Sequence, residues 1–155
     1  MEQHGLETTI AGHKFFKDLD PSFIELVSGC AKNVRFEAGS YLLHEGDGAS
    51  TFFLIRHGRV TLEIAAPGRQ PMRFMTVDEG DIVGVSWLFP PYRWNYDARA
   101  LELVRAIAID ATCLRDKCEA DNTLGYELMK RFVPALAGRL QATRLQLLDL
   151  YGKPA

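Results

Sequence analysis

Residues 33–64, NVRFEAGSYLLHEGDGASTFFLIRHGRVTLEI, separate short apolar runs by glycines at nearly regular intervals. The end of this stretch, Val60-Thr61-Leu62-Glu63-Ile64, alternates apolar and polar residues, as expected for a strand with one buried face. Glycines continue to separate the apolar runs at Gly68, Gly80 and Gly84. Glycines placed in this way predict turns between short antiparallel strands.

Eight short strands are expected in the middle of the chain, at residues 33–36, 40–44, 51–56, 60–65, 72–77, 82–83, 97–102 and 104–109. Their spacing of about 8 to 12 residues favours a jelly roll or a β-sandwich.

Helices are expected on both sides of the strands. Asp20-Pro21 has the form of an N-cap followed by proline in the first turn. Asp110 can cap a second helix, and Asp121 or Asn122 can cap a long third one.

The predicted fold is therefore mostly β with flanking helices, a double-stranded β-helix jelly roll followed by a long C-terminal dimerisation helix. We expect an N-terminal tail over residues 1–13, the β-roll domain over 14–121 and the long helix over 122–151.

The last helix carries the clearest periodicity in the sequence. Successive a and d positions of four heptads are apolar at seven places out of eight: Tyr126, Met129, Val133, Leu136, Leu140, Thr143, Leu147 and Leu150. Leu145 and Leu148 form a second apolar stripe, so one stripe can face the β-domain and the other a partner. We expect a homodimer whose interface contains Val133, Leu136, Leu140, Thr143, Leu147 and Leu150.

Composition excludes several classes of protein. The 155 residues are 47% hydrophobic and 25% charged, with a net charge of −2, so a broad basic surface for nucleic acid is not expected. No apolar run is long enough for a membrane span, and residues 1–11 lack the apolar core of a signal peptide. We expect a cytoplasmic protein without membrane or direct nucleic-acid contacts, whose cysteines, Cys30, Cys113 and Cys118, are reduced thiols.

Catalytic and metal motifs are not found in the sequence. There is no Gly-x-Ser-x-Gly and no cysteine paired with a plausible base, so an enzyme is not expected. A jelly roll could instead be a cupin-type metalloenzyme, which would need a His-x-His pair. The histidines do not provide one, and no metal site is predicted: they are His4, His13, His44 and His57.

The order of motifs resembles the cyclic-nucleotide-binding domain of the Crp/Fnr regulators over about residues 15–151. The resemblance rests on six segments in the right order: FFKDL at 15–19, FEAG at 36–39, HEGD at 44–47, FFLIRHGRV at 52–60, EGDIVG at 79–84 and RLQAT at 139–143. It implies a phosphate-binding cassette closed by the long helix, and cAMP or cGMP as ligand. No cofactor follows from the residues themselves.

The resemblance implies where ligand contacts would lie. The cassette begins at Gly84, Val85 stands where the family has a glutamate that binds the ribose, and Trp94 stands where it has the arginine that binds the phosphate. Arg93 lies one position early, and in an extended segment a shift by one residue turns a side chain to the opposite face. The implied contacts are Gly84, Val85, Ser86, Arg93, Trp94, Asn95, Arg139 and Thr143.

The cassette is rich in aromatic residues, with Trp87, Phe89, Tyr92, Trp94 and Tyr96 inside ten positions. Three interpretations remain open: the rings fill the pocket, they line a pocket for a flatter or more apolar ligand, or they form a partner-binding surface.

The sequence thus predicts a ligand-sensing regulatory module with a degenerate cassette that acts through partners. Because the sequence ends four residues after Tyr151, no helix-turn-helix module is expected. The alternative is a true cAMP or cGMP sensor that uses Arg93 for the phosphate. Neither the ligand nor a protein partner is identified by the sequence.

Overall fold

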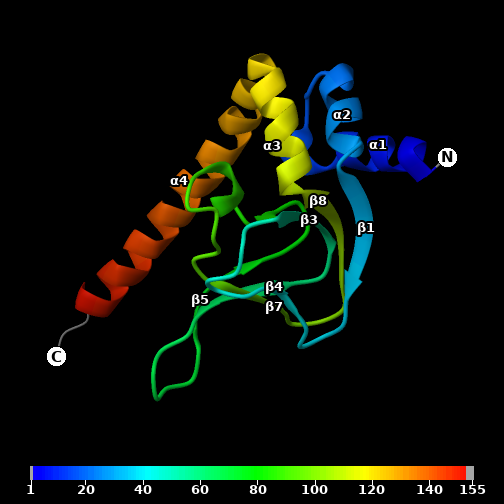
Figure 1. Ribbon diagram of the computed structural model, residues 1–155. Helices are drawn as coiled ribbons and strands as arrows, with labels where there is room; N and C mark the ends of the chain where they lie inside the picture. Colours follow the sequence, from blue (N-terminus) through cyan, green and yellow to red (C-terminus); the bar gives the residue numbers. More distant parts are fainter. Residues whose placement is uncertain (1, 153–155) are drawn as a thin grey trace.

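A computed structural model describes residues 2–152 of the chain, with a β-roll covered by helices (Figure 1). Its helices are α1 (Glu2–Gly12), η1 (Lys14–Phe16), α2 (Pro21–Ser28), η2 (Ser86–Leu88), α3 (Ala111–Ala120) and α4 (Asn122–Gly152). Its strands are β1 (Ala31–Phe36), β2 (Tyr41–Leu43), β3 (Thr51–His57), β4 (Val60–Ile64), β5 (Met72–Val77), β6 (Ile82–Val83), β7 (Asp97–Ala100) and β8 (Val104–Asp110). The predicted jelly roll and long helix are confirmed.

The strands form two four-stranded antiparallel sheets, in the orders β1-β8-β3-β6 and β2-β7-β4-β5. Apolar residues of both sheets meet in one core, where Leu54, Leu62, Ala98 and Ile107 have no exposed surface. The turn between β3 and β4 requires glycine, because Gly58 has a φ of +95° and an added Cβ would lie 2.4 Å from the Leu103 carbonyl oxygen.

The polar side of β4 is buried as well. Thr61 is fully buried and Glu63 is 3% exposed, although alternation predicts one solvated face. β4 lies between β5 and β7, and Arg99 on β7 donates a hydrogen bond to the Glu63 carboxylate at 2.8 Å. This hydrogen bond, together with the charge of Glu63, raises the pKa of Arg99. The ion pair with Arg99 thus replaces the hydration of the Glu63 carboxylate on this face of β4.

Residues 2–12 form helix α1, where the sequence suggested a tail; Met1 lies outside the described residues. Leu6 and Ile10, one turn apart, are both buried and hold the helix against the domain. The spacing of these two residues is the signal that could have identified the helix.

Aspartates begin the three helices at which capping was expected. Asp20 accepts a hydrogen bond from the Ser22 amide, and Asp110 accepts one from the Cys113 amide at 2.9 Å. Asp121 accepts from the amides of Thr123 and Leu124. These side chains satisfy amides that have no partner inside the helix.

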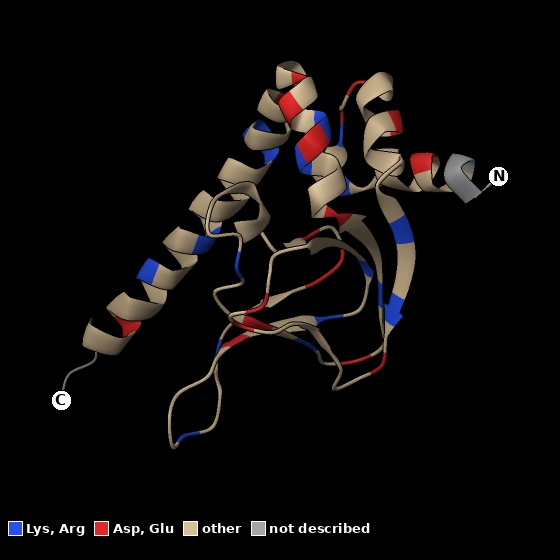
Figure 2. Ribbon diagram, in the orientation of Figure 1, with Lys and Arg blue, Asp and Glu red and all other residues tan. Residues whose placement is uncertain are grey.

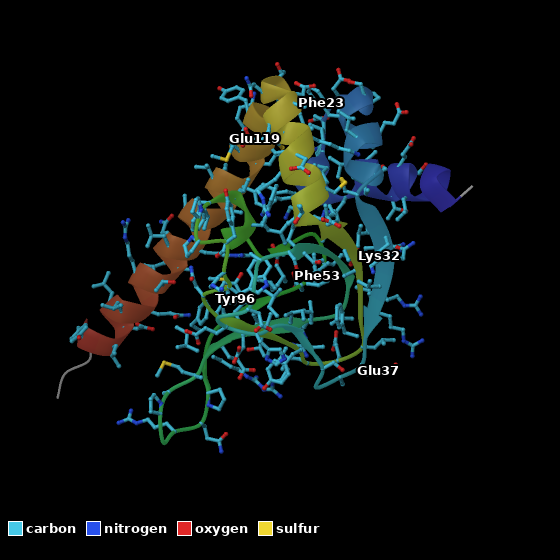
Figure 3. The ribbon with its side chains drawn as sticks, in the orientation of Figure 1. Phe23, Lys32, Glu37, Phe53, Tyr96 and Glu119 are labelled. Atoms are coloured by element: carbon cyan, nitrogen blue, oxygen red, sulfur yellow. A yellow bond between two sulfur atoms is a disulfide. The ribbon has the colours of Figure 1, made fainter. Side chains whose placement is uncertain are left out.

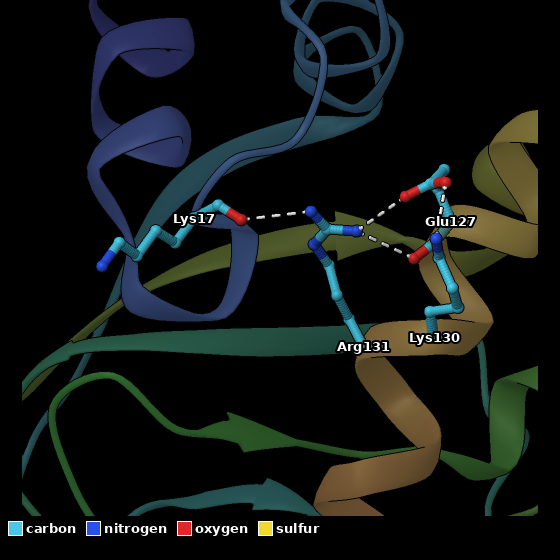
Figure 4. Close-up of polar contacts among 4 residues, drawn as sticks. All are labelled: Lys17, Glu127, Lys130 and Arg131. Atoms are coloured by element: carbon cyan, nitrogen blue, oxygen red, sulfur yellow. Dashed lines mark hydrogen bonds and ion pairs between the residues drawn. The ribbon is translucent and has the colours of Figure 1, made fainter.

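The fully buried residues of helix α4 all lie in its first half. Leu124, Leu128 and Phe132 are fully buried, and none of them belongs to the predicted heptad seam. Arg131 ties the same half to the N-terminal segment, donating to the Lys17 carbonyl at 3.1 Å and to Glu127 (Figure 4). The hydrogen bond from Lys130 and that from Arg131 lower the pKa of Glu127.

The apolar seam of α4 is exposed to solvent in this single chain. Val133, Leu136, Leu140, Leu147 and Leu150 are each at least 42% exposed. The second stripe was expected to offer a surface to the β-domain, but Leu145 and Leu148 are 60% and 66% exposed. Packing on the domain comes instead from the residues four apart at 124, 128 and 132.

Two of the three cysteines form a disulfide, Cys30–Cys113, so the prediction of reduced thiols is wrong for this pair. Pairing of β1 with β8 places Ala31 opposite Ile109, which brings the two cysteines together although 83 positions separate them. The spacing of the two cysteines along the sequence does not predict this contact. Cys118 is free and half-buried, and burial raises the pKa of its thiol to about 11.

Charged residues of both signs are distributed over the helices and strands (Figure 2). None of the helices in residues 2–152 combines the length and the apolar character needed to cross a membrane.

Candidate functional site

The segment between β6 and β7, residues 84–96, lies where the roll meets α4 (Figure 1). We call it the cassette. The indole of Trp87 is fully buried, stacks on Phe52 at 4.7 Å between ring centroids, and meets Phe132 of α4 edge-on at 5.4 Å. One aromatic cluster therefore connects the sheet, the cassette and the long helix.

Gly84 and Trp94 are in direct contact. Gly84 has a φ of +102°, and a Cβ added there would lie 2.7 Å from Cη2 of Trp94 and 3.2 Å from Cβ of Phe52. Trp94 itself is 5% exposed. The indole thus fills the space next to Gly84, at the position that the resemblance assigns to a phosphate-binding arginine.

Arg93 lies on the other side of the cassette. Its guanidinium is exposed and donates a hydrogen bond to the Gly46 carbonyl at 2.8 Å. On either side of Arg93, the Trp94 amide donates to the Asp47 carbonyl and the Ala49 amide donates to the Tyr92 carbonyl. The cassette is therefore bound to the turn before β3; Arg93 and Asn95 are exposed, and Trp94 between them is buried.

The remaining predicted contacts of the cassette differ in exposure. Val85 and Ser86 are buried, whereas Asn95 is exposed. The structure brings Gly84 and Trp94 together, while Arg93 and Asn95 face solvent.

Arg139 of α4 reaches β6, just before the cassette, and its guanidinium donates a hydrogen bond to the Ile82 carbonyl, two residues before Gly84. Thr143 is half-buried, and its hydroxyl donates to the Arg139 carbonyl at 2.9 Å, one turn earlier in the same helix. Of the two predicted helix residues, Arg139 therefore contacts the roll, and Thr143 bonds to its own helix.

Tyr96, the last residue of the cassette, is not among the ligand contacts that the resemblance implies. Its ring meets Phe74 at 5.7 Å, on the side of the roll toward α4 (Figure 3). Its hydroxyl is buried and has no hydrogen bond of normal geometry to a described residue. Burial raises the pKa of Tyr96, while the charge of Arg139 and the backbone of Gly84 oppose the increase. A buried hydroxyl next to a cationic side chain can bind a polar ligand group.

The five aromatic residues of the cassette do not behave alike. Trp87 and Trp94 belong to the hydrophobic core, and Phe89 is 44% exposed. Tyr92 is half-buried, and the guanidinium of Arg115 on α3 lies 4.3 Å above its ring. The two tryptophans are thus buried, whereas the phenylalanine is exposed.

Metal ligands do not gather at this site. Among the residues that the structure describes, no three His, Cys, Asp or Glu side chains are placed to hold a metal ion together.

Comparisons with known proteins agree with this architecture. The family model of the cyclic nucleotide-binding domain matches residues 33–121, more than half of the chain. A CRP-like cAMP-activated global transcriptional regulator of Mycobacterium tuberculosis is 26% identical over 94% of this chain. The chain spans 63% of the length of that regulator.

Solved structures give the same result. A protein of Geobacter metallireducens described as cyclic nucleotide-binding superposes with a TM-score of 0.77 and 27% identity, covering 90% of this chain and 98% of the other. A cAMP-binding acyltransferase of Mycobacterium smegmatis superposes with a TM-score of 0.63 and 25% identity, covering 74% of this chain and 35% of the enzyme. The domain therefore occurs within an enzyme chain as well as in regulators.

The motif order, the β-roll closed by α4 and the match over residues 33–121 lead to one conclusion. This chain belongs to the cyclic nucleotide-binding domain family and resembles the Crp-like regulators.

Proposed function

We propose that the chain is a ligand-sensing regulatory module of the Crp/Fnr kind that acts through protein partners and is not itself an enzyme. The observation that carries the proposal is the pair of contacts that the long helix makes with the cassette and with β6 just before it. Phe132 packs on Trp87, and Arg139 bonds to the Ile82 carbonyl beside Gly84. A ligand that binds more tightly to one arrangement of these contacts would shift the position of α4.

The ligand contacts are proposed to be Gly84, Val85, Ser86, Trp94, Arg139 and Thr143, together with the buried hydroxyl of Tyr96. Two usual contacts of the family are replaced, because Val85 cannot accept a hydrogen bond from a ribose and Trp94 cannot pair with a phosphate. We therefore propose that cAMP and cGMP are not held in the usual way. The loss of both contacts corresponds to a decrease in affinity of roughly a hundredfold or more.

Calorimetric titration with cAMP and cGMP tests this proposal. We expect no binding at micromolar nucleotide. Micromolar binding that Arg93→Ala abolishes and Arg69→Ala retains would establish the alternative, in which Arg93 leaves the Gly46 carbonyl and binds the phosphate. Arg69 is a matched control, since it is an exposed arginine in the loop between β4 and β5.

We also propose that α4 pairs with α4 of a second copy. Support comes from the exposed seam, where Leu136, Leu140 and Leu147 occupy a and d positions of the heptads and are 42% to 52% exposed. Such a stripe on a helix favours burial against a like helix.

Sedimentation at tens of micromolar protein tests the dimer. Leu140→Glu places a charge in the seam and should give a monomer. Leu145→Glu, an equally drastic change on the other stripe, should leave the dimer intact. A monomeric wild type, or a dimer that persists in Leu140→Glu, would refute the proposed interface.

A further inference from the structure

We propose that Cys30 and Cys113 are a reversible redox couple whose state sets the shape of the cassette through α3. The disulfide joins the end of α2 and start of β1 to the first turn of α3. It is therefore the covalent link between the N-terminal helices and the helix that leads into α4.

The two sulfur atoms lie beside an open hollow. Cys30 and Cys113 line a surface depression of about 300 Å³ together with Gly29, Lys32 and Asp110. Cys113 is half-buried and borders this depression. Cys113 lies in the first turn of α3, at the positive end of the helix dipole. Lys32 adds a positive charge to this depression, and Asp110, whose carboxylate accepts a hydrogen bond from the Cys113 amide, adds a negative charge.

Helix α3 links this disulfide to the cassette. Arg115, two residues after Cys113, donates a hydrogen bond to the Trp87 carbonyl at 2.7 Å and lies over the ring of Tyr92. Tyr92 has a φ of +55°, a conformation that residues other than glycine adopt at a cost. On the opposite side, Lys117 donates to the Leu26 carbonyl at the end of α2. Helix α3 thus contains one cysteine of the disulfide and forms hydrogen bonds with both the cassette and α2.

The chemistry is thiol–disulfide exchange with a low-molecular-weight thiol such as glutathione. The thiolate of one reagent molecule attacks a sulfur of the disulfide, forms a mixed disulfide and releases a protein thiolate, which takes up a proton. A second reagent thiolate displaces the remaining protein sulfur. Two reagent thiols become one reagent disulfide and two protein thiols form; oxidation is the reverse.

Cys118 stays outside the couple. It lies five residues beyond Cys113, against Gly125 of α4, and burial raises the pKa of its thiol to about 11. At neutral pH it is almost entirely protonated, and the protonated thiol is not the attacking species.

Reduction would leave the first turn of α3 joined to the start of β1 only by hydrogen bonds, such as that from the Asp110 amide to the Cys30 carbonyl at 2.8 Å, and would loosen the hold of Arg115 on the cassette. Both tryptophans of the chain, Trp87 and Trp94, are buried in the cassette, so their emission reports its shape directly. The inference concerns the site of the proposed function, but its test needs no ligand. Failure of the redox couple is therefore distinguishable from failure of ligand sensing.

The experiment follows intrinsic tryptophan emission of the whole chain across ratios of reduced to oxidised glutathione. Thiols are counted in parallel by alkylation after denaturation, and the expected number rises from one to three on reduction, because the chain has three cysteines and one disulfide. We expect emission to move to longer wavelength in step with that number. Cys118→Ser should behave like wild type, and Cys30→Ser/Cys113→Ser should not respond.

A second variant tests the role of Arg115 as a positioning residue. Arg115→Met should lose most of the emission change and, because the coupling is reciprocal, should make the disulfide easier for glutathione to reduce. Arg105→Met, at an exposed arginine of β8, should keep both the emission change and the glutathione midpoint of wild type. Emission that stays constant while the thiol number rises from one to three would overturn the proposal. So would a disulfide that millimolar glutathione does not reduce without denaturant, or a response that requires Cys118.

Discussion

The two halves of α4 are held in opposite ways. From Asn122 to Phe132 the helix buries Leu124, Leu128 and Phe132 completely, and Phe132 touches Phe15, Phe52 and Trp87. Beyond Pro134 the large apolar residues are exposed, and the helix meets the roll through side-chain hydrogen bonds to carbonyls, from Arg139 to Ile82 and from Gln146 to Phe74.

The two halves of α4 therefore contribute differently to stability and to movement. Apolar burial in a packed core is lost in large steps when atoms are removed. A hydrogen bond at the surface exchanges with water at little net cost. A groove of about 400 Å³ also runs between the second half and β5–β6, lined by Ile82, Ala135, Gly138 and Arg139 among others. The first half therefore anchors the helix, and the second half can change position.

The largest effect is expected at the anchor. Phe132→Ala should lower the free energy of unfolding by about 3–5 kcal/mol, because a fully buried ring leaves a cavity among three other rings. Leu147→Ala, in the exposed half, should change it by less than about 0.5 kcal/mol in the monomeric Leu140→Glu background. Urea denaturation measures both; similar losses for the two variants would show that the halves do not differ.

The disulfide should contribute next. Cys30→Ala/Cys113→Ala should lower the free energy of unfolding by about 2–4 kcal/mol, because the bond closes a long loop in the unfolded chain. Cys118→Ala is the matched control and should cost less, since no bond is lost. The comparison is made by thermal denaturation under oxidising conditions. Equal losses for the two variants would contradict the prediction.

A smaller and pH-dependent effect is expected at His13, which positions Phe15 against the anchor. Nδ1 of His13 accepts a hydrogen bond from the Phe15 amide, and Nε2 lies 2.9 Å from the Ile55 carbonyl. Burial lowers the pKa of His13 below its ordinary value of 6.5, and the bond to Ile55 opposes the decrease only in part. The unfolded chain therefore takes up the proton at a higher pH than the folded one.

It follows that the contribution of His13 to stability is fully present above about pH 6.5 and is lost as pH falls through the pKa of the folded state. His13→Gln retains a donor and an acceptor without a titrating group, and should show a shallower decline in stability between neutral and acidic pH. Identical pH profiles for wild type and variant would rule out this role.

The smallest effect is expected at the second half of α4. Gln146→Ala removes an exposed hydrogen bond to the Phe74 carbonyl and should cost about 0.5–1 kcal/mol. Hydrogen exchange of the amides in residues 139–150 should nevertheless become faster, since one of two polar contacts with the roll is lost. Unchanged exchange would mean that this contact does not hold the helix.

Much of the fold follows from the sequence because its signals are local. Alternation, glycine turns and aspartate caps depend on residues a few positions apart, and the eight strands and three capped helices lie where these signals place them. Pairs such as Cys30–Cys113 and Arg115–Trp87 depend on strand pairing over long separations, which no local pattern carries.

The sequence predicts the candidate site only in part. Arg93 lies one position before the place implied for the phosphate-binding arginine, and in the structure Arg93 is exposed while Trp94 is buried. The sequence could not predict the surroundings of the Tyr96 hydroxyl, because the charge of Arg139 comes close to it only when α4 folds onto the roll. The heptad pattern identified an exposed seam, but not the buried residues between its positions, because both lie on one helix with several apolar faces.

The central claim is that Trp94 and Val85 remove the usual cyclic-nucleotide contacts from an otherwise intact roll. Its most direct test is calorimetric titration of cAMP into wild type and into Val85→Glu/Trp94→Arg, which restores the two side chains that the resemblance implies. The account predicts no binding at micromolar cAMP for wild type and binding gained by the folded variant. Wild-type affinity equal to or above that of the variant would contradict it.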